Sequence, residues 1–124
     1  MKRATAAAVG VAGFRIAYGL ALAAAPGSTT KSWLGEDGAS AGGKVALRAL
    51  GAREIVIHAG AIAAALSGAA VRPWLVGSIA GDVSDIAATF VSGHRLPDGA
   101  PLKTLAVAGG SAALSAAVVA ALDE

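Results

Sequence analysis

Residues 45–67 form an apolar stretch that has charged side chains in its interior. The stretch reads VALRALGAREIVIHAGAIAAALS and is long enough to cross a bilayer at about 1.5 Å of rise per residue. Its ionisable residues are Arg48, Arg53, Glu54 and His58. A charge at that depth costs on the order of 3 kcal/mol by insertion scales, so it persists where it faces a helix bundle and finds an opposite charge. We expect the partners to be Asp82 and Asp85, in the next apolar stretch.

The composition favours a membrane protein over a water-soluble one. Hydrophobic residues make up 56 % of the 124 residues and charged residues only 15 %, compared with roughly 25 % charged in soluble domains. Much of the apolar content is alanine, so an alanine-rich soluble bundle that oligomerises stays as an alternative. The absence of cysteine excludes disulfides and thiolate chemistry. The net charge of +2 comes from scattered residues, and without a basic patch no nucleic-acid partner is expected.

The apolar stretches predict four helices in a single membrane domain, residues 1–124. We expect the helices over about residues 4–25, 45–67, 73–91 and 101–122. The predicted fold class is all-α: a four-helix transmembrane bundle with both termini on the same side, in a multi-pass protein of the cell membrane. The short connection between the second and third helices predicts that they are antiparallel neighbours. In the fourth helix, Gly109 and Gly110 predict a close approach to another helix.

The first apolar stretch resembles a secretory signal, because Lys2 and Arg3 precede a run that ends in small residues before Pro26. However, Arg15 lies in the middle of this run, where a signal core is uncharged, and the run is long enough to span a bilayer. We therefore predict a retained first helix. Positions three and four apart are neighbours on a helix, so Arg15 and Tyr18 share one face.

Residues 27–44, rich in glycine, serine and threonine, are predicted to form a polar linker. Trp33 lies between charged residues of this linker. Its side chain either anchors the linker among lipid headgroups or forms a lid over a cavity. Trp74, near the start of the third helix, is predicted to lie at a membrane interface.

Polar residues recur at helical spacing on three of the predicted helices. The stripes are Arg48, Gly51, Glu54 and His58 on the second helix, Ser78, Asp82, Asp85 and Thr89 on the third, and the milder Thr104, Ser111 and Ser115 on the fourth. Arg53 falls on the opposite side of the second helix, so it must meet another helix or reach an interface.

These charged groups predict a polar site between the first three helices. Three arginines, Arg15, Arg48 and Arg53, balance three carboxylates, and near-neutrality is what a buried network requires. Asp82 and Asp85 are one turn apart, so one of them is expected to hold a proton and the two to act as an acid–base pair. Glu54 and His58 are expected to relay protons.

The remaining candidate residues would contact a ligand. The arginines Arg15, Arg48 and Arg53 would bind an anion or an oxyanion, and Tyr18 and Trp33 would line the cavity. The predicted function is binding, or acid–base conversion, of a small amphipathic or lipid-like molecule. The conversion would be an isomerisation, a cyclisation or an epoxide opening.

Three alternatives stay open. In the first, the charges have no function other than to hold the helices in register. In the second, the protein is an accessory or scaffold subunit of a larger membrane assembly. In the third, it is a small proton-coupled carrier that works as an oligomer. A metal site built from Glu54, His58 and the aspartates is disfavoured because arginines nearby would oppose a cation. No metal and no cofactor are predicted. The expected partners are the lipid bilayer, a small amphipathic ligand, and a homo-oligomer or larger membrane complex.

Several short motifs carry a resemblance to a known family. They are Arg15-x-x-Tyr18-Gly19 with Pro26 after it, Trp33-x-Gly35, Arg48-x-x-Gly51-x-Arg53-Glu54, and Trp74 followed by Asp82-x-x-Asp85. Over roughly residues 12–85 the chain resembles a family of small actinobacterial and fungal integral membrane proteins of unknown function. The resemblance implies a four-helix membrane fold and implies no activity.

Overall fold

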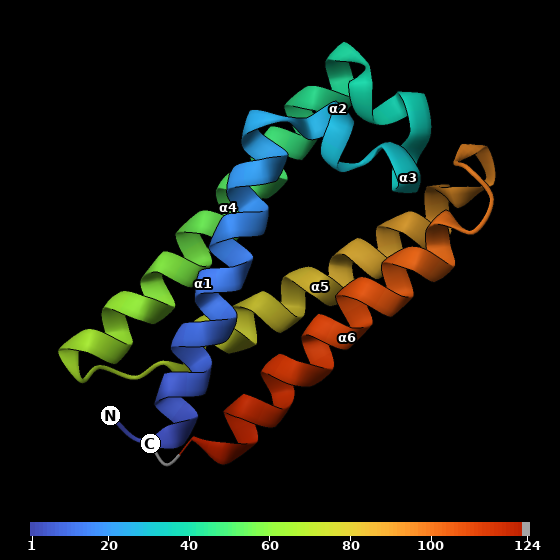
Figure 1. The fold of residues 1–124 in the computed structure, drawn as a ribbon. Coiled ribbons are helices and arrows are strands. Elements are labelled where there is room, and N and C mark those ends of the chain that lie inside the picture. The colour runs from blue at the N-terminus through green and yellow to red at the C-terminus, as the bar shows by residue number, and fades with distance from the viewer. Residues whose placement is uncertain (123–124) are drawn as a thin grey trace.

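The computed structural model describes residues 1–122, and its regular structure in that range is all helical (Figure 1). The elements in chain order are α1 (Arg3–Ala24), α2 (Pro26–Thr29), α3 (Lys31–Leu34), η1 (Gly35–Ala39), α4 (Ala41–Ser67), α5 (Arg72–Ser92), η2 (Gly93–Arg95) and α6 (Ala100–Ala121). The long helices α1, α4, α5 and α6 correspond to the four predicted helices, and α4 begins earlier than expected, at Ala41.

The long helices pack as two antiparallel pairs (Figure 1). The most extensive packing is between α1 and α4 and between α5 and α6. The pairs meet through α4 and α5, as the short connection between those helices predicts, and through α1 and α6. In Figure 1 the start of α1 and the end of α6 lie at one end of the molecule, while α2, α3 and η2 lie at the other.

The close crossing of α1 and α4 depends on two glycines. A Cβ atom added to Gly19 would lie 2.7 Å from the carbonyl oxygen of Gly51, and one added to Gly51 would lie 2.5 Å from the carbonyl oxygen of Gly19. Small residues allow helix backbones to approach in this way. At Gly109 and Gly110, where the sequence predicts that another helix can approach, a Cβ on Gly109 would meet only ordinary contacts and one on Gly110 nothing within 4 Å, so the packing of the described helices does not require either glycine.

The apolar core lies toward the end of the molecule where α1 starts. Its buried members are Ala8, Ala12, Ala61, Ala64, Val71, Leu75, Val118 and Leu122. Half of them are alanine, so the helices close on one another at this end. Trp74 packs its ring directly against the backbone of Gly60 on the neighbouring helix.

The segment predicted to be a polar linker is folded, which corrects that expectation. It forms two short helical turns, α2 and α3, and the 3-10 turn η1 before α4 begins. Pro26 occupies the first turn of α2, a position where its missing N–H costs nothing. The buried hydroxyl of Thr30 donates to the carbonyl of Pro26 at 2.7 Å. Ser40 then caps α4, because its hydroxyl accepts from the N–H of Gly43 at 3.0 Å.

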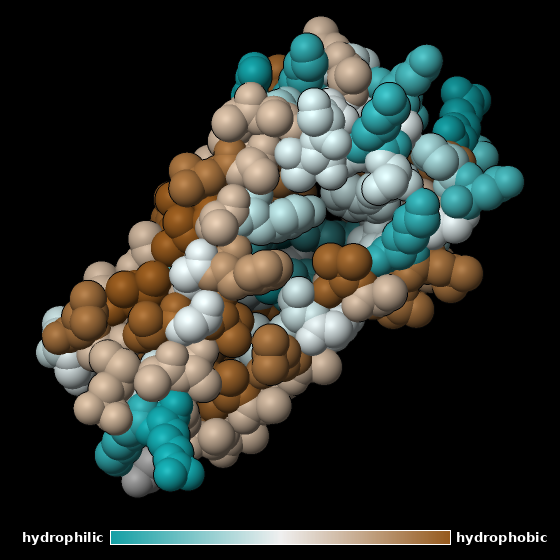
Figure 2. Space-filling view, in the orientation of Figure 1, coloured by the Kyte–Doolittle hydropathy of each residue, from teal (hydrophilic) through white to brown (hydrophobic). Residues whose placement is uncertain are grey.

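The outer surface of the long helices is apolar. All four are long and apolar enough to cross a membrane, and only 17–28 % of the most apolar window of each is buried inside the molecule. Figure 2 shows hydrophobic side chains along the helices and hydrophilic ones gathered at the two ends. Water-soluble monomers rarely expose apolar surface on this scale, so the distribution indicates association with a membrane.

Candidate functional site

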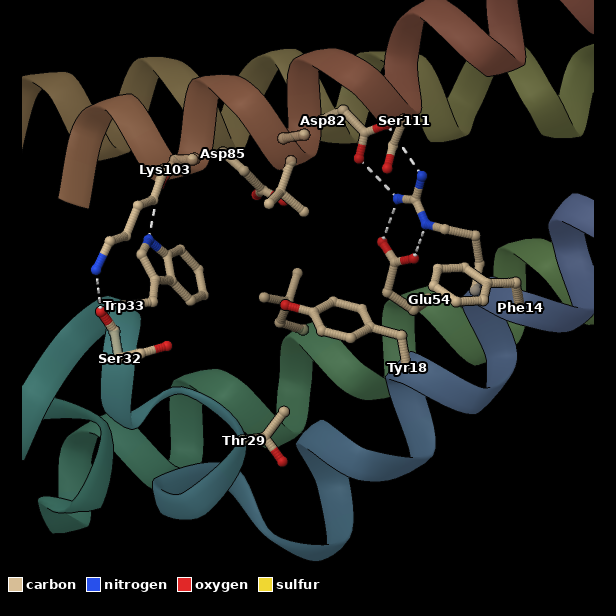
Figure 3. A pocket seen from close by; sticks show the side chains of 15 residues that line it. Phe14, Tyr18, Thr29, Ser32, Trp33, Glu54, Asp82, Asp85, Lys103 and Ser111 are labelled. Carbon is tan, nitrogen blue, oxygen red and sulfur yellow. Dashed lines mark hydrogen bonds and ion pairs between the residues drawn. The ribbon is translucent and has the colours of Figure 1, made fainter. Parts of the chain in front are cut away.

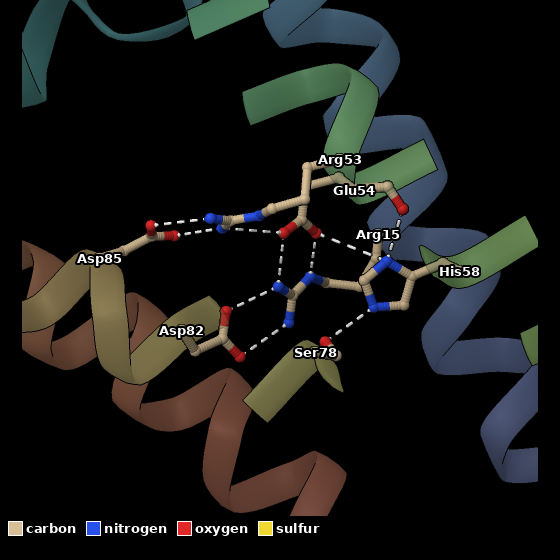
Figure 4. Close-up of polar contacts among 7 residues, drawn as sticks. All are labelled: Arg15, Arg53, Glu54, His58, Ser78, Asp82 and Asp85. Carbon is tan, nitrogen blue, oxygen red and sulfur yellow. Dashed lines mark hydrogen bonds and ion pairs between the residues drawn. The ribbon is translucent and has the colours of Figure 1, made fainter. Parts of the chain in front are cut away.

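Arg15 ties three helices together through its guanidinium group (Figure 4). Its Nε and Nη2 donate to the two carboxylate oxygens of Glu54 on α4, at 2.6 and 2.9 Å. Its Nη1 and Nη2 donate to the two oxygens of Asp82 on α5, at 3.1 and 2.7 Å. All three side chains are buried, with 7 % or less of each exposed. Paired, bidentate contacts are the strong form of charge-assisted hydrogen bond.

The crossing of α1 and α4 at Gly19 and Gly51 positions the side chains of this network. Arg15 lies one helical turn before Gly19, and Glu54 lies one turn after Gly51. Residues three and four apart share a helix face, so the two side chains project into the space beside the crossing. The backbones are close there, and this lets the carboxylate of Glu54 reach both edges of the guanidinium.

A second ion pair joins the opposite side of α4 to α5. Arg53 donates from Nη1 and Nη2 to the two oxygens of Asp85, at 3.2 and 2.7 Å. Its Nη2 also lies 3.8 Å from Glu54 Oε1, which links this pair to the network around Arg15. A Cβ on Gly81 would lie 3.3 Å from the guanidinium carbon of Arg53. Arg53, which lies off the polar stripe, therefore meets another helix as predicted, and its guanidinium packs against the backbone of α5.

His58 is fully buried behind the network. Its Nδ1 lies 2.6 Å from the backbone oxygen of Glu54, and its Nε2 lies 2.9 Å from the hydroxyl of Ser78. A carbonyl oxygen can only accept, so Nδ1 carries a hydrogen, and in the neutral ring Nε2 accepts from the serine. The carboxylate of Glu54 is 3.6 Å from Nδ1, which is outside hydrogen-bonding distance.

A cavity of about 390 Å³ lies beside the ion pairs, between the two helix pairs (Figure 3). It is lined by residues of all four long helices and of α2 and α3: Phe14, Arg15, Tyr18, Thr29, Ser32, Trp33, Leu50, Glu54, Asp82, Asp85, Lys103, Thr104, Val107, Ala108 and Ser111. The face of the molecule in Figure 2 is hollowed between the helix pairs, and hydrophilic atoms lie inside the hollow.

The short helix α3 closes one end of this cavity and is fastened to α6. The indole Nε1 of Trp33 donates to the hydroxyl of Thr104 at 2.7 Å. Next to it, the ammonium of Lys103 donates to the backbone oxygen of Ser32 at 2.6 Å. The sequence predicts that Trp33 is either a headgroup anchor or a lid over a cavity, and this arrangement favours the lid.

Arg48 lies outside the network, although it shares a sequence stripe with Glu54. Its side chain is exposed, and its Nε donates to the backbone oxygen of Ala23 at 3.1 Å. The last carbonyls of a helix have no partner within the helix, so this contact completes the end of α1. The buried and half-buried groups therefore comprise two arginines, Arg15 and Arg53, and three carboxylates.

Of the candidate residues, the structure brings seven together. Arg15, Tyr18, Trp33, Glu54, Asp82 and Asp85 line the cavity or form its wall, and Arg53 holds Asp85 from outside the cavity. His58 contacts Glu54 but not the cavity, and Arg48 is elsewhere. Within residues 1–122 no group of three or more His, Cys, Asp or Glu side chains is arranged to hold a metal ion.

Sequence reasoning missed several lining residues. Phe14 and Leu50 are apolar residues in apolar helices, so no local signal distinguishes them from lipid-facing neighbours. Lys103 had a usable signal, since it is a lone charge in the first turn of an apolar helix.

Comparisons with known proteins identify no relative of this chain. The chain matches no protein-family model, and no curated protein sequence and no solved structure is significantly similar to it. The resemblance to small actinobacterial and fungal membrane proteins therefore stays a prediction.

Proposed function

We propose that this chain is a multi-pass protein of the cell membrane whose cavity binds a small amphipathic molecule. The four long helices would be the spans, with both termini on the same side of the membrane. The observation that carries the proposal is the cavity itself: about 390 Å³ of space lined by three carboxylates together with apolar side chains.

The surface supports the membrane assignment. Large apolar side chains are exposed along all four long helices, including Leu20, Val56, Val83 and Leu114. In water these side chains would favour aggregation, whereas in a bilayer they would face lipid. The charged groups at mid-helix depth face one another instead of this surface.

The lining of the cavity supports binding of an amphipathic molecule. Ligand cavities are mostly apolar with a few placed polar groups, and their volumes begin at about 300 Å³. Phe14 and Val107 line this cavity and are also 73 % and 65 % exposed. An apolar tail can therefore leave the cavity between α1 and α6 while a polar head meets the carboxylates.

Acid–base conversion of the bound molecule is a second candidate. Three carboxylates and the Tyr18 hydroxyl share one cavity, and proton transfer needs such groups within reach of the substrate. Asp82 and Asp85 would act on the ligand directly. His58 would not act on the ligand, because it does not reach the cavity and its Nδ1 hydrogen is held by the backbone oxygen of Glu54.

Membrane topology can be tested with single cysteines, because the chain has none. We would introduce Lys2→Cys, Ser28→Cys, Val56→Cys, Ala69→Cys and Asp98→Cys one at a time and label intact cells and opened membranes with an impermeant maleimide. The expected result is one side for residues 2 and 69, the other side for residues 28 and 98, and no labelling at residue 56. Rapid labelling at residue 56 would contradict membrane insertion.

Ligand binding can be tested by releasing the protein from native membranes under non-denaturing conditions and measuring bound small molecules by mass spectrometry. Ala108→Phe would fill the cavity, while Ala113→Phe, on the exposed side of the same helix, is the matched control. We expect a bound species in the unmodified protein and in the control, and none in Ala108→Phe. A species that is unaffected by Ala108→Phe, or a co-purifying protein with an empty cavity, would favour the scaffold alternative.

A further inference from the structure

We infer that the cavity takes a cationic head, a protonated amine on an apolar chain, and not the anion that the arginines suggest at first sight. This inference deepens the proposed function and rests on it, because it assigns the chemical class of the molecule that the cavity binds.

The arginine that lines the cavity, Arg15, has little capacity left for an anion. Arg15 makes four hydrogen bonds, all to the carboxylates of Glu54 and Asp82. Arg53 directs both of its Nη groups to Asp85, and although its buried Nε has no partner, the residue is not part of the cavity lining. A guanidinium has five N–H donors and no acceptor, so Arg15 is nearly saturated. An anion entering the cavity would meet carboxylate oxygens first.

The unused capacity in the cavity wall belongs to acceptors. A carboxylate pair of oxygens offers about four lone-pair sites, and each oxygen of Asp82 accepts one hydrogen bond from Arg15. Glu54 and Asp85 line the same cavity with their oxygens likewise bonded to arginine. A ligand that donates hydrogen bonds would fill these sites, and one that only accepts would leave them empty.

The formal charges point the same way. The network has two guanidinium groups, Arg15 and Arg53, and three carboxylates, which leaves one negative charge in excess when His58 is neutral. A buried unpaired charge is strongly unfavourable. The excess is removed either by a proton on one carboxylate or by a cation, and the adjacent cavity has room for the cation.

Besides Arg15, the cavity lining has one further cation, Lys103. Its position does not remove the excess negative charge of the network. Its side chain is exposed, and its ammonium is held by the backbone oxygen of Ser32 on the lid. Figure 3 shows this side chain reaching toward Ser32 and away from Asp82. An exposed charge is screened by solvent and ions, so it does not neutralise the buried carboxylates.

Two aromatic rings complete a site for an ammonium group. Tyr18 projects into the cavity from α1, and Trp33 projects into it from α3 (Figure 3). Aromatic faces attract cations, and more strongly where water is excluded. The apolar chain of the ligand would leave through the opening beside Phe14 and Val107.

The test uses three amphiphiles of equal chain length that differ only in the head: decylamine, decanol and decanoate. The protein would be reconstituted in phosphatidylcholine nanodiscs with Trp74→Phe, which leaves Trp33 as its single tryptophan and thus as a fluorescent reporter in the cavity. Background partitioning is measured on the same protein with Ala108→Phe, and with Ser111→Phe as a second blocking variant.

We expect decylamine to bind about tenfold or more tightly than decanol, as a charge-assisted hydrogen bond implies, and decanoate to bind weakest. Asp85→Asn removes the excess charge at a half-buried position and should reduce the preference for decylamine over decanol, whereas Ser84→Ala on the exposed face of α5 should not. Equal binding of decylamine and decanol, both blocked by Ala108→Phe, would overturn the cationic head, assign a proton to the network and leave the cavity function standing. Tightest binding of decanoate would overturn it as well. Binding that neither blocking variant affects would overturn both the inference and the proposed function.

Discussion

Gly19 and Gly51 face each other where α1 crosses α4, so closely that a methyl group on Gly51 would lie 2.5 Å from the carbonyl oxygen of Gly19. The contact involves backbone on both sides, so neither helix can yield by rotating a side chain. The same crossing sets the spacing between Arg15 and Glu54, one turn away on each helix. Helix packing and the ion-pair network therefore depend on one geometry.

Gly51→Ala should consequently destabilise the protein. Overpacking at a rigid contact costs about 1–3 kcal/mol, and the shift would also lengthen the contact between Arg15 and Glu54. The measurement is unfolding in detergent followed by circular dichroism. Gly13→Ala is the control, because a Cβ there meets nothing within 4 Å; it should be neutral or stabilising. Equal effects of the two substitutions would contradict the close crossing.

Arg15→Gln should be among the most damaging substitutions in the chain. Removing the guanidinium leaves the buried carboxylates of Glu54 and Asp82 without their shared partner, and breaking a buried ion pair in this way costs about 3–5 kcal/mol. Arg15→Lys keeps the charge but loses the planar fork, so it should fall in between. Unfolding curves of purified variants give the comparison.

Arg48→Gln is the matched control for this series. Arg48 is exposed and makes one hydrogen bond, to the backbone of Ala23, so its loss should cost about 1 kcal/mol or less. If Arg48→Gln were as damaging as Arg15→Gln, the assignment of Arg48 to the end of α1 would be wrong.

Ser78→Ala should destabilise the protein through His58. The imidazole is fully buried, and its Nε2 has the Ser78 hydroxyl as partner. A buried acceptor left without a donor costs about 1–3 kcal/mol. Ser84→Ala, on the exposed face of the same helix, should have little effect. Chemical shifts of the His58 ring in labelled protein would show directly whether Nε2 has lost its hydrogen bond.

Trp33→Phe should loosen the lid without unfolding the helices. The variant keeps an aromatic ring but loses the Nε1–H that donates to Thr104, while Thr104 keeps its own bond to the backbone of Ala100. We expect faster amide hydrogen exchange in α2, α3 and η1, with α1 and α4 unchanged. Trp74→Phe, at the other end of the molecule, is the control. Unchanged exchange would mean that the bond to Thr104 does not hold the lid.

The sequence predicts the four long helices and the meeting of their charges, because both follow from local rules. Charges in the middle of apolar helices must pair, so a contact between the arginines and the carboxylates of the first three long helices is expected. Which arginine takes which carboxylate is not predictable, since Glu54, Asp82 and Asp85 are chemically alike. The choice depends on how the helices cross, and for α1 and α4 the close approach requires Gly19 and Gly51.

The departures from expectation have physical reasons as well. Arg48 lies on the predicted stripe, but α1 ends at Ala24, so Arg48 lies beside the end of that helix and stays exposed. The glycine-rich segment folds because a proline starts α2 and buried Thr30 ties it back, and composition alone does not reveal this. The cavity arises from the arrangement of two helix pairs that close over small residues at one end only, and no local pattern encodes that arrangement.

The distribution of the paired charges along the chain has a consequence for biosynthesis. Arg15 and Glu54 both precede Ser67, so a nascent polypeptide that has emerged only that far already contains a complementary couple and needs no later segment to form it. Arg53 is also synthesised before Ser67, but its partner Asp85 is synthesised later. Until the third long helix arrives, the network groups of the hairpin have a surplus of positive charge, because two arginines face one carboxylate. Asp82 and Asp85 then reverse the sign of the charge within the network.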